Sequence, residues 1–187
     1  MKKLVYLSLG SNLGDRRGNL DAAIERLREL GEVKSVSSIY ETEPVEYTAQ
    51  PDFLNCALAL ETEKMPRQLL AAVLAIEKDL GRRRAKAGPG PRIKGPRTID
   101  IDIVLFGRAV VDLPELTIPH PAMHERRFVL EPLAEIAPDV RHPVLRRTLR
   151  ELRDALPPGG VRKIHRKDAK DAKDAEKSKK PQRGLRQ

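Results

Sequence analysis

The sequence contains very few of the residues that stabilise small secreted proteins. Among its 187 residues there is one cysteine, Cys56, and no tryptophan, and aromatic residues make up 3% of the chain. A single cysteine excludes an intramolecular disulfide framework and is typical of a reducing compartment, so we expect a cytoplasmic location and a buried, structural thiol. Because aromatic rings are scarce, the core must be built from Leu, Ile, Val and Ala.

Long apolar runs are absent as well. A membrane-spanning helix needs about 20 apolar residues, and the N-terminal stretch MKKLVYLSLGSNLGD is soon interrupted by Ser and Gly. We therefore expect neither a membrane span nor a signal peptide. The GxxxxGK[ST] loop and the strand–GxGxxG–helix pattern are also missing, so any nucleotide chemistry must use a different arrangement of residues.

The net charge of +9 is concentrated at one end of the chain. Residues 157–187 contain 11 Lys and Arg against 4 Asp and Glu, and they include the repetitive stretch DAKDAKDAE. Such a segment has too few apolar residues to build a core. We therefore predict a globular domain over residues 1–157 and a basic, low-complexity, disordered tail over 158–187, and we expect no specific nucleic-acid partner.

Hydrophobic periodicity predicts an α+β fold with the element order β-α-β-β-α-β. Apolar patterns with the period of a strand occur at 4–9, 33–42, 53–62 and 95–107. Patterns with the period of a helix occur at 15–30 and 66–80, and further short helical segments begin near Pro121. This order predicts a ferredoxin-like antiparallel sheet with its helices packed on one face, and another α+β sandwich is the alternative.

The segment GPRTIDIDIVLFG carries two carboxylates on one face of a predicted strand. Ile99, Ile101 and Ile103 alternate with Asp100 and Asp102, so the isoleucines point to one side and the aspartates to the other. Two carboxylates placed in this way suit a hard cation such as Mg²⁺, whose other ligands are waters and phosphate oxygens. The alternative is a solvent-exposed strand face without a ligand.

A long segment rich in arginine, lysine, glycine and proline precedes this strand. Its cations are Arg82, Arg83, Arg84, Lys86, Arg92, Lys94 and Arg97. Arginine binds phosphate bidentately and stabilises charge that develops on a transferred group. Together with the aspartates, these cations indicate Mg²⁺-dependent phosphate chemistry, although the same run taken alone is more typical of a solvated loop.

Two phenylalanines and an amide indicate a site for a flat heterocycle. Phe53 and Phe128 would sandwich such a ring if both flank one pocket. Asn55 lies on the same strand face as Phe53 and can both donate and accept hydrogen bonds at the edge of the ring. His120 could bind a phosphate. Core phenylalanines and a structural histidine are the alternatives.

Four blocks of sequence, in order, carry a family resemblance: YLSLGSNLGDR, QPDFLNCALALET, GPRTIDIDIVLFG and LTIPHPAMHERRFVLEPLAEIAPD. Over residues 4–152 the chain resembles the 6-hydroxymethyl-7,8-dihydropterin pyrophosphokinases of folate biosynthesis. The resemblance implies a ferredoxin-like fold and an enzyme that transfers the β,γ-pyrophosphoryl group of MgATP to the hydroxymethyl oxygen of the pterin, releasing AMP. It also implies two Mg²⁺ ions bound with ATP, and we expect a monomer.

The resemblance also implies residue roles. Catalytic positions correspond to Arg82, Arg97, Asp100 and Asp102, and the two aspartates are the metal ligands. Pterin-binding positions correspond to Gly10, Thr42, Val45, Phe53, Asn55 and Phe128. ATP-binding positions correspond to Leu70, Leu74, Glu77, Arg84, Arg97, Ile103, Leu116, Thr117, His120 and Arg126. The chain departs from the family in having Phe53 where many members have Tyr, in lacking a Trp before GPR, and in a longer loop over 85–94.

Two other functions are compatible with parts of the sequence. A ferredoxin-like RNA-binding module with a basic tail would stack bases on exposed aromatic residues and carry an RNP-like motif, but the chain has only three Phe and three Tyr and no such motif. An inactive homologue is the other alternative, and the presence of Asn55, Arg97 and both aspartates argues against it.

Overall fold

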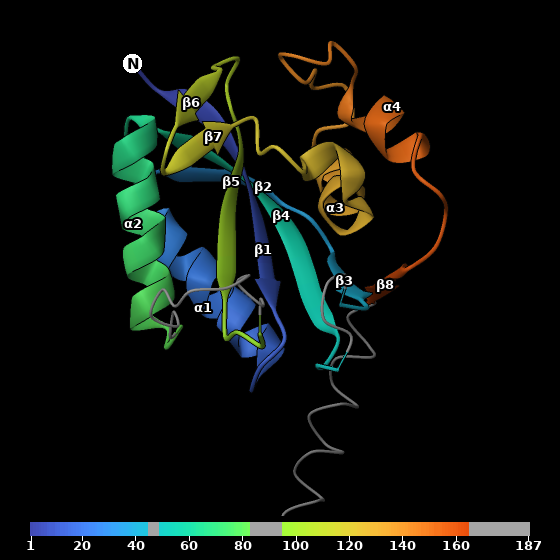
Figure 1. Ribbon diagram of the computed structural model, residues 1–187. Helices are drawn as coiled ribbons and strands as arrows, with labels where there is room; N and C mark the ends of the chain where they lie inside the picture. Colours follow the sequence, from blue (N-terminus) through green and yellow to red (C-terminus); the bar gives the residue numbers. More distant parts are fainter. Residues whose placement is uncertain (45–48, 83–94, 165–187) are drawn as a thin grey trace, which may run out of the picture.

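The computed structural model describes residues 1–44, 49–82 and 95–164 (Figure 1). Val45, Arg84 and the loop 85–94, all named in the sequence predictions, lie outside these residues. Within the described residues the fold is α+β, as expected, with a six-stranded sheet, a separate two-stranded ribbon and helices on both faces of the sheet. No helix in this part of the chain is long and apolar enough to cross a membrane.

Every strand pairing in the main sheet is antiparallel. The strands are β1 (Lys3–Ser11), β2 (Glu32–Val36), β3 (Ile39–Thr42), β4 (Phe53–Thr62), β5 (Asp100–Phe106) and β8 (Val161–Ile164). Their order is β5-β1-β4-β3-β8, and β2 also pairs with β4. The central position of β1 and β4 explains why both are buried along most of their length.

The strand predicted over 33–42 is two strands, β2 and β3, which pair with successive parts of β4. The break falls at Ser37 and Ser38, whose hydroxyl groups bind a backbone N–H of β4 and the side chain of Glu135. The Ser37 hydroxyl accepts a hydrogen bond from the backbone N–H of Ala57 at 2.8 Å, and the Ser38 hydroxyl donates to Glu135 at 2.8 Å. Serine competes with regular backbone pairing in this way, so periodicity alone did not reveal the break.

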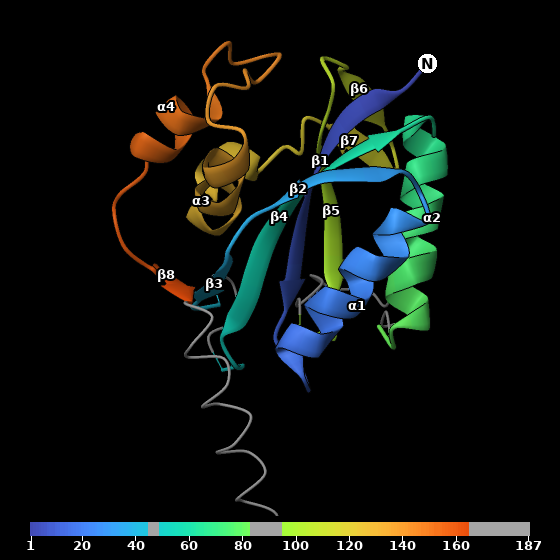
Figure 2. The same ribbon diagram turned by 180° about the vertical axis from the view of Figure 1, so that it is seen from behind.

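Helices α1 (Arg16–Arg28) and α2 (Pro66–Asp79) cover one face of the sheet (Figure 2). Asp15 caps α1, because its carboxylate accepts a hydrogen bond from the N–H of Gly18 at 2.9 Å. The buried residues of both helices recur at helical spacing: Leu20, Ala23, Leu27, Leu69, Val73 and Ile76. They pack against the odd-numbered side chains of β1 and the isoleucines of the GPRTIDIDIVLFG segment.

The other face of the sheet carries α3 (Arg127–Ile136), α4 (Leu149–Asp154) and the 3₁₀ turn η1 (Met123–Glu125). The prediction that the helices pack on one face is therefore wrong. The reason is that the central strands carry apolar residues on both faces along part of their length. On the second face, Ala57 and Ala59 of β4 form a surface of small residues on which α3 packs. This second layer covers only part of the face and leaves the rest open.

Two further features lie outside the predicted elements. β6 (Val111–Leu113) and β7 (Leu116–Ile118) form the two-stranded ribbon. β8 falls inside the tail that was predicted to be disordered, yet it pairs with β3 at the edge of the main sheet. For residues 161–164 the prediction of disorder is therefore wrong. Two ion pairs hold β8 there, one from Arg162 to Glu41 and one from Lys163 to Glu135.

Candidate functional site

Polar residues from three adjacent strands form a row on the open part of the sheet. Gly10 on β1 lies opposite Asn55 on β4 and opposite Asp100 on β5. One step along β1, Ser8 lies opposite Asp102. Because paired residues of antiparallel strands point to the same face, the alternation in each strand sends these side chains away from the α1–α2 core.

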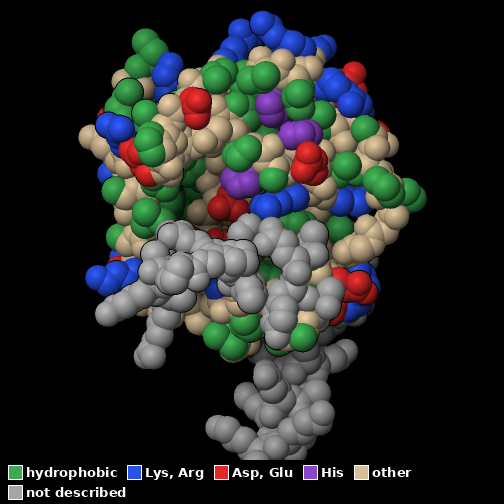
Figure 3. Space-filling model, in the orientation of Figure 1, with side chains coloured by type: hydrophobic (Ala, Val, Ile, Leu, Met, Phe, Trp, Pro, Cys, Tyr) green, Lys and Arg blue, Asp and Glu red, His purple; other side chains and the backbone are tan. Residues whose placement is uncertain are grey.

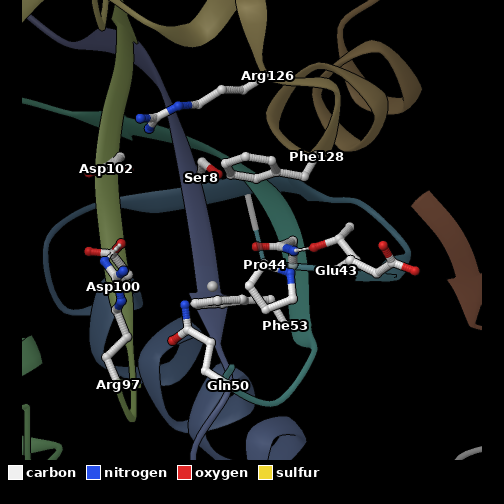
Figure 4. Close-up of a pocket in the computed structure, with 13 residues that line it drawn as sticks. Ser8, Glu43, Pro44, Gln50, Phe53, Arg97, Asp100, Asp102, Arg126 and Phe128 are labelled. Atoms are coloured by element: carbon white, nitrogen blue, oxygen red, sulfur yellow. Dashed lines mark hydrogen bonds and ion pairs between the residues drawn. The ribbon is translucent and has the colours of Figure 1, made fainter. Parts of the chain in front are cut away.

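This row forms the floor of a pocket (Figure 4). The described ends of the connection between β3 and β4, with Glu43, Pro44 and Gln50, and the start of α3 form its walls. On the face seen in Figure 3, histidine, acidic and basic side chains lie close together above the grey residues. The lining residues are Ser8, Gly10, Thr42, Glu43, Pro44, Gln50, Phe53, Asn55, Arg97, Asp100, Asp102, Arg126 and Phe128. The pocket thus has an aromatic and amide end and a carboxylate end.

At the aromatic end, Phe53 and Phe128 lie on opposite sides of the space (Figure 4). Asn55 is buried between β1 and β3, and its amide nitrogen donates to the Thr42 hydroxyl at 2.7 Å. This bond fixes the side-chain amide, whose oxygen then lies next to Gly10. A Cβ atom at Gly10 would come within 2.8 Å of the Asn55 Oδ1 atom, so only glycine fits there without a shift.

At the carboxylate end, two arginines bind Asp100. Arg82 donates to one carboxylate oxygen at 2.5 Å and Arg97 to the other at 2.6 Å. Arg82 also pairs with the buried carboxylate of Glu77, which accepts a hydrogen bond from the Ile101 N–H at 2.8 Å. The two arginines are thus held beside the proposed metal ligands by residues of α2 and β5.

The two ends of the pocket are connected by cationic side chains over the rings. The Arg97 guanidinium lies 5.6 Å from the centroid of Phe53, and the Arg126 guanidinium lies 5.8 Å from the centroid of Phe128. Such cation–π contacts orient both arginines toward the space between the rings and the aspartates. A ligand with a flat ring and an anionic group would therefore meet matching chemistry at each end.

Asp102 is held in an electrostatically unfavourable environment. Burial, followed by the charge of neighbouring Asp100 and then Glu77, raises the pKa of Asp102 from 3.8 to about 7, while Arg126 and Arg82 oppose the rise. A divalent cation would reverse this effect, because it would favour the ionised carboxylate. The raised pKa is therefore what a cation-binding carboxylate pair would show before the cation binds.

The donor set fits Mg²⁺ bound together with a phosphate. Asp100 and Asp102 supply carboxylate oxygens, the ligands that Mg²⁺ prefers, from one face of a rigid strand. No group of three or more His, Cys, Asp or Glu residues in the described part of the chain could hold a metal by itself. A metal at the two aspartates would thus take its remaining ligands from water and phosphate oxygens.

The pocket brings together most of the residues predicted for the pterin and for catalysis. Those that line it are Gly10, Thr42, Phe53, Asn55, Phe128, Arg97, Asp100, Asp102 and Arg126, and Arg82 and Glu77 join through their ion pairs. Val45 and Arg84 lie outside the described residues. The prediction that Phe53 and Asn55 share one strand face is confirmed, and Ala57 and Ala59 lie on the same face of β4.

The other residues predicted to bind ATP do not line this pocket. Leu70, Ile103 and Leu116 pack in the α1–α2 core, and Leu74 lies on α2, half-buried. Thr117 is exposed on β7. The N–H of His120 donates to the carbonyl of Val104 at 3.0 Å.

Four pocket residues escaped the sequence predictions: Ser8, Glu43, Pro44 and Gln50. A signal for Ser8 was present, because it lies two residues before Gly10 on the same strand and must share its face. Gln50 depends on a distant contact that no local pattern reveals. The buried Asn12 donates to Gln50 Oε1 at 3.0 Å and accepts from the Arg97 N–H at 2.8 Å, so it connects the two ends of the pocket.

An α+β sheet with two carboxylates and several arginines beside an aromatic pocket is typical of proteins that handle phosphorylated ligands. The chain belongs to the family described as 7,8-dihydro-6-hydroxymethylpterin-pyrophosphokinase (HPPK), which it matches over residues 6–138.

Its relatives include separate enzymes and longer proteins. It is 42% identical over 166 residues to the 2-amino-4-hydroxy-6-hydroxymethyldihydropteridine pyrophosphokinase of Pseudomonas aeruginosa, an alignment that covers 88% of this chain and 98% of the relative. It is also 42% identical over 162 residues to the folic acid synthesis protein fol1 of Schizosaccharomyces pombe, of which it spans only 21% against 86% of its own length. The chain thus spans about a fifth of some curated relatives.

A comparison of structures supports the fold. The Plasmodium falciparum HPPK-DHPS crystal structure with pteroate superposes with a TM-score of 0.64 at 17% sequence identity, covering 82% of this chain and 42% of that one. At this identity the likeness concerns the fold alone.

Proposed function

We propose that this protein transfers the β,γ-pyrophosphoryl group of ATP to the hydroxymethyl oxygen of 6-hydroxymethyl-7,8-dihydropterin and releases AMP, as a step of folate biosynthesis. The observation that carries the proposal is that one pocket is lined both by the aromatic pair with Asn55 and by the aspartate pair with its arginines. Family membership adds to this support, because relatives of similar length are named for this pyrophosphokinase activity.

In the proposed complex the pterin lies between Phe53 and Phe128. Stacking on both faces of the ring suits a flat heterocycle. The Asn55 amide, oriented by its bond to Thr42, would donate to and accept from the ring edge. Gly10 leaves the sheet floor open beneath the ring, since any side chain there would collide with Asn55. Val45 is a further proposed pterin residue, on the basis of the family resemblance.

At the carboxylate end, Asp100 and Asp102 would hold Mg²⁺ with ATP, and we propose two ions. When bound, the metal would supply neutralisation of the phosphate charges. Arg82 and Arg97 now bind Asp100, and they are placed to exchange that carboxylate for phosphate oxygens. Because arginine forms bidentate contacts with phosphate, they would stabilise the charge of the transferred group. Proximity and orientation would then account for catalysis without a covalent intermediate.

The nucleotide would lie beyond the carboxylates, toward α2 and β7. Leu70, Ile103 and Leu116 belong to the apolar core on the α1–α2 side of the sheet, and Leu74 is half-buried on α2. On the basis of the family resemblance alone, we propose that these four residues form the side of the nucleotide site that is nearest to the base, and that Thr117, His120 and Arg126 add polar contacts. Arg84 would join them from the cationic segment.

Several further properties are part of the proposal. The order β5-β1-β4-β3 with α1 and α2 as crossovers supports a ferredoxin-like assignment of the core. A monomer, a cytoplasmic location and a division between a domain and a basic tail remain predictions from the sequence. The RNA-binding alternative gains no support, because Phe53 and Phe128 line a pocket and Tyr6 and Tyr40 are buried.

A product assay tests the proposed function. Purified protein receives ATP, Mg²⁺ and the reduced pterin alcohol, and chromatography separates AMP from ADP. We expect AMP only when the pterin is present, and we expect Asp100→Ala to abolish it while Asp112→Ala, an exposed residue of β6, retains it. ADP as the product, or no pterin-dependent AMP from the folded wild type, would refute the proposal.

A further inference from the structure

The connection between β3 and β4 reaches the aromatic end of the pocket with its described parts, residues 43–44 and 49–52. It contributes Glu43, Pro44 and Gln50 to the wall, and it joins β3 to β4. At its base, Thr42 pairs with Phe53 across the two strands. The positions of the ring-binding residues therefore depend on how firmly the two ends of this loop are held together.

One side chain from outside the loop bridges both ends. Arg16, the first residue of α1, donates through Nη1 to the backbone carbonyl of Asp52 at 2.8 Å. Through Nη2 it pairs with the Glu41 carboxylate on β3 at 3.1 Å. Asp52 directly precedes Phe53, and Glu41 directly precedes Thr42, so a single guanidinium fastens the chain on each side of the pocket loop. Its planar fork suits two acceptors at once.

Glu41 is held from its other side by the sheet edge. Arg162 on β8 lies opposite Glu41 in the strand register and pairs with its second carboxylate oxygen. The Glu41 side chain is 18% exposed and that of Arg16 is 31%, whereas that of Arg162 is 69% exposed. The inner pair is thus better shielded from solvent, and we expect the outer pair to contribute less.

We propose that Arg16 is a positioning residue for the heterocyclic substrate, acting through the Arg16–Glu41–Asp52 contacts. This inference rests on the proposed function, because it concerns the same pocket. Arg16 does not line the pocket, so it would act by holding Thr42 and Phe53, the neighbours of its two partners, in the geometry that binds the ring. Without it, the strand ends that carry Thr42 and Phe53 would be held less firmly, and the affinity for the ring would fall.

The test is the steady-state kinetics of Arg16→Ala with each substrate varied in turn. We expect the KM for the pterin to rise about tenfold, the loss expected for one charge-assisted hydrogen bond. The KM for ATP and kcat should change less than twofold, because the carboxylate end of the pocket is untouched. Equilibrium binding of the pterin, measured by its own fluorescence with a nonhydrolysable ATP analogue present, should weaken by the same factor.

Arg17→Ala is the matched control. Arg17 follows Arg16 on α1 and pairs only with Asp21, at 3.7 Å on the helix surface, among the contacts found for it. It should leave the pterin KM unchanged. Glu41→Gln keeps an acceptor for Arg16 but loses its charge, so we expect a two- to threefold rise in the pterin KM. A merely structural role of Arg16 would lower the active fraction and the melting temperature and leave the pterin KM as in the wild type.

The outcomes separate the inference from the function on which it rests. Turnover by the wild type with an unchanged pterin KM in Arg16→Ala would refute the positioning role, as would an equal rise in Arg17→Ala. If Arg16→Ala does not fold, Glu41→Gln decides in its place, and an unchanged pterin KM there refutes the role. A folded wild type that neither binds the pterin nor forms AMP would instead refute the proposed function.

Discussion

Replacing Asp102 with asparagine should change how the stability of the protein depends on pH. Asparagine has nearly the same shape but cannot ionise. In the wild type without Mg²⁺, the raised pKa means that the native state keeps a proton on Asp102 between about pH 4 and pH 7, where the unfolded state has lost it. Raising the pH through this window therefore lowers the free energy of unfolding of the wild type, and the variant lacks this loss.

The structure gives the size of the effect. The pKa of Asp102 rises from 3.8 to about 7, so roughly 3 pK units separate the two states. Each unit corresponds to about 1.4 kcal/mol, which gives an upper value of about 4 kcal/mol. Because the side chain is only half-buried and the pocket is open to solvent, we expect about 2 kcal/mol between pH 4.5 and pH 8.

Urea denaturation followed by circular dichroism measures this difference. The stability of the wild type minus that of Asp102→Asn should fall by about 2 kcal/mol from pH 4.5 to pH 8 in Mg²⁺-free buffer. Asp112→Asn, an exposed position on β6, controls for the substitution itself. A difference that stays constant, or that grows with pH, would show that Asp102 is not held in the environment described, and the argument for a cation site would lose its electrostatic basis.

Three other perturbations address separate parts of the molecule. Gly10→Ala should lower the free energy of unfolding by about 1–3 kcal/mol in urea titrations, because it displaces the buried Asn55 amide, whereas Gly95→Ala, with nothing within 4 Å, should be nearly neutral; equal effects would contradict the close contact. Burial raises the pKa of the Cys56 thiol to about 12, so a thiol reagent at pH 8 should react only after unfolding, and rapid reaction of the native protein would disprove its burial. Arg97→Ala should lower kcat about 100-fold and raise the pterin KM only slightly, and the reverse pattern would argue against a role in stabilising the transferred group.

The sequence predicted the central strands well because their patterns are strong and local. The strand predicted over residues 53–62 has those limits in the structure, since its apolar residues are continuous and both ends are marked by polar loops. The aspartates of β5 lie on the face that alternation predicts. These features depend only on residues within one element.

The missed features depend on contacts between distant residues. β8 has two apolar residues in four and no clear periodicity. Its position depends on pairing with the distant strand β3 and on ion pairs with Glu41 and Glu135. The placement of α3 on the second face depends on the small residues of β4. Gln50 lies in the pocket wall because Asn12 holds it from another loop. No single-element pattern contains this information.

The row of Asn55, Gly10 and Asp100 across β4, β1 and β5 fixes the distance between the two ends of the pocket. Neighbouring strands are about 4.8 Å apart, so the amide and the carboxylate arise from backbones about 10 Å apart, a separation fixed by two ladders of hydrogen bonds. A deletion of one residue within any of these strands would turn the pocket-facing side chain of that strand toward the core. The separation between Asn55 and Asp100 therefore does not change when side chains repack. It selects ligands by the distance between their ring and their charged group.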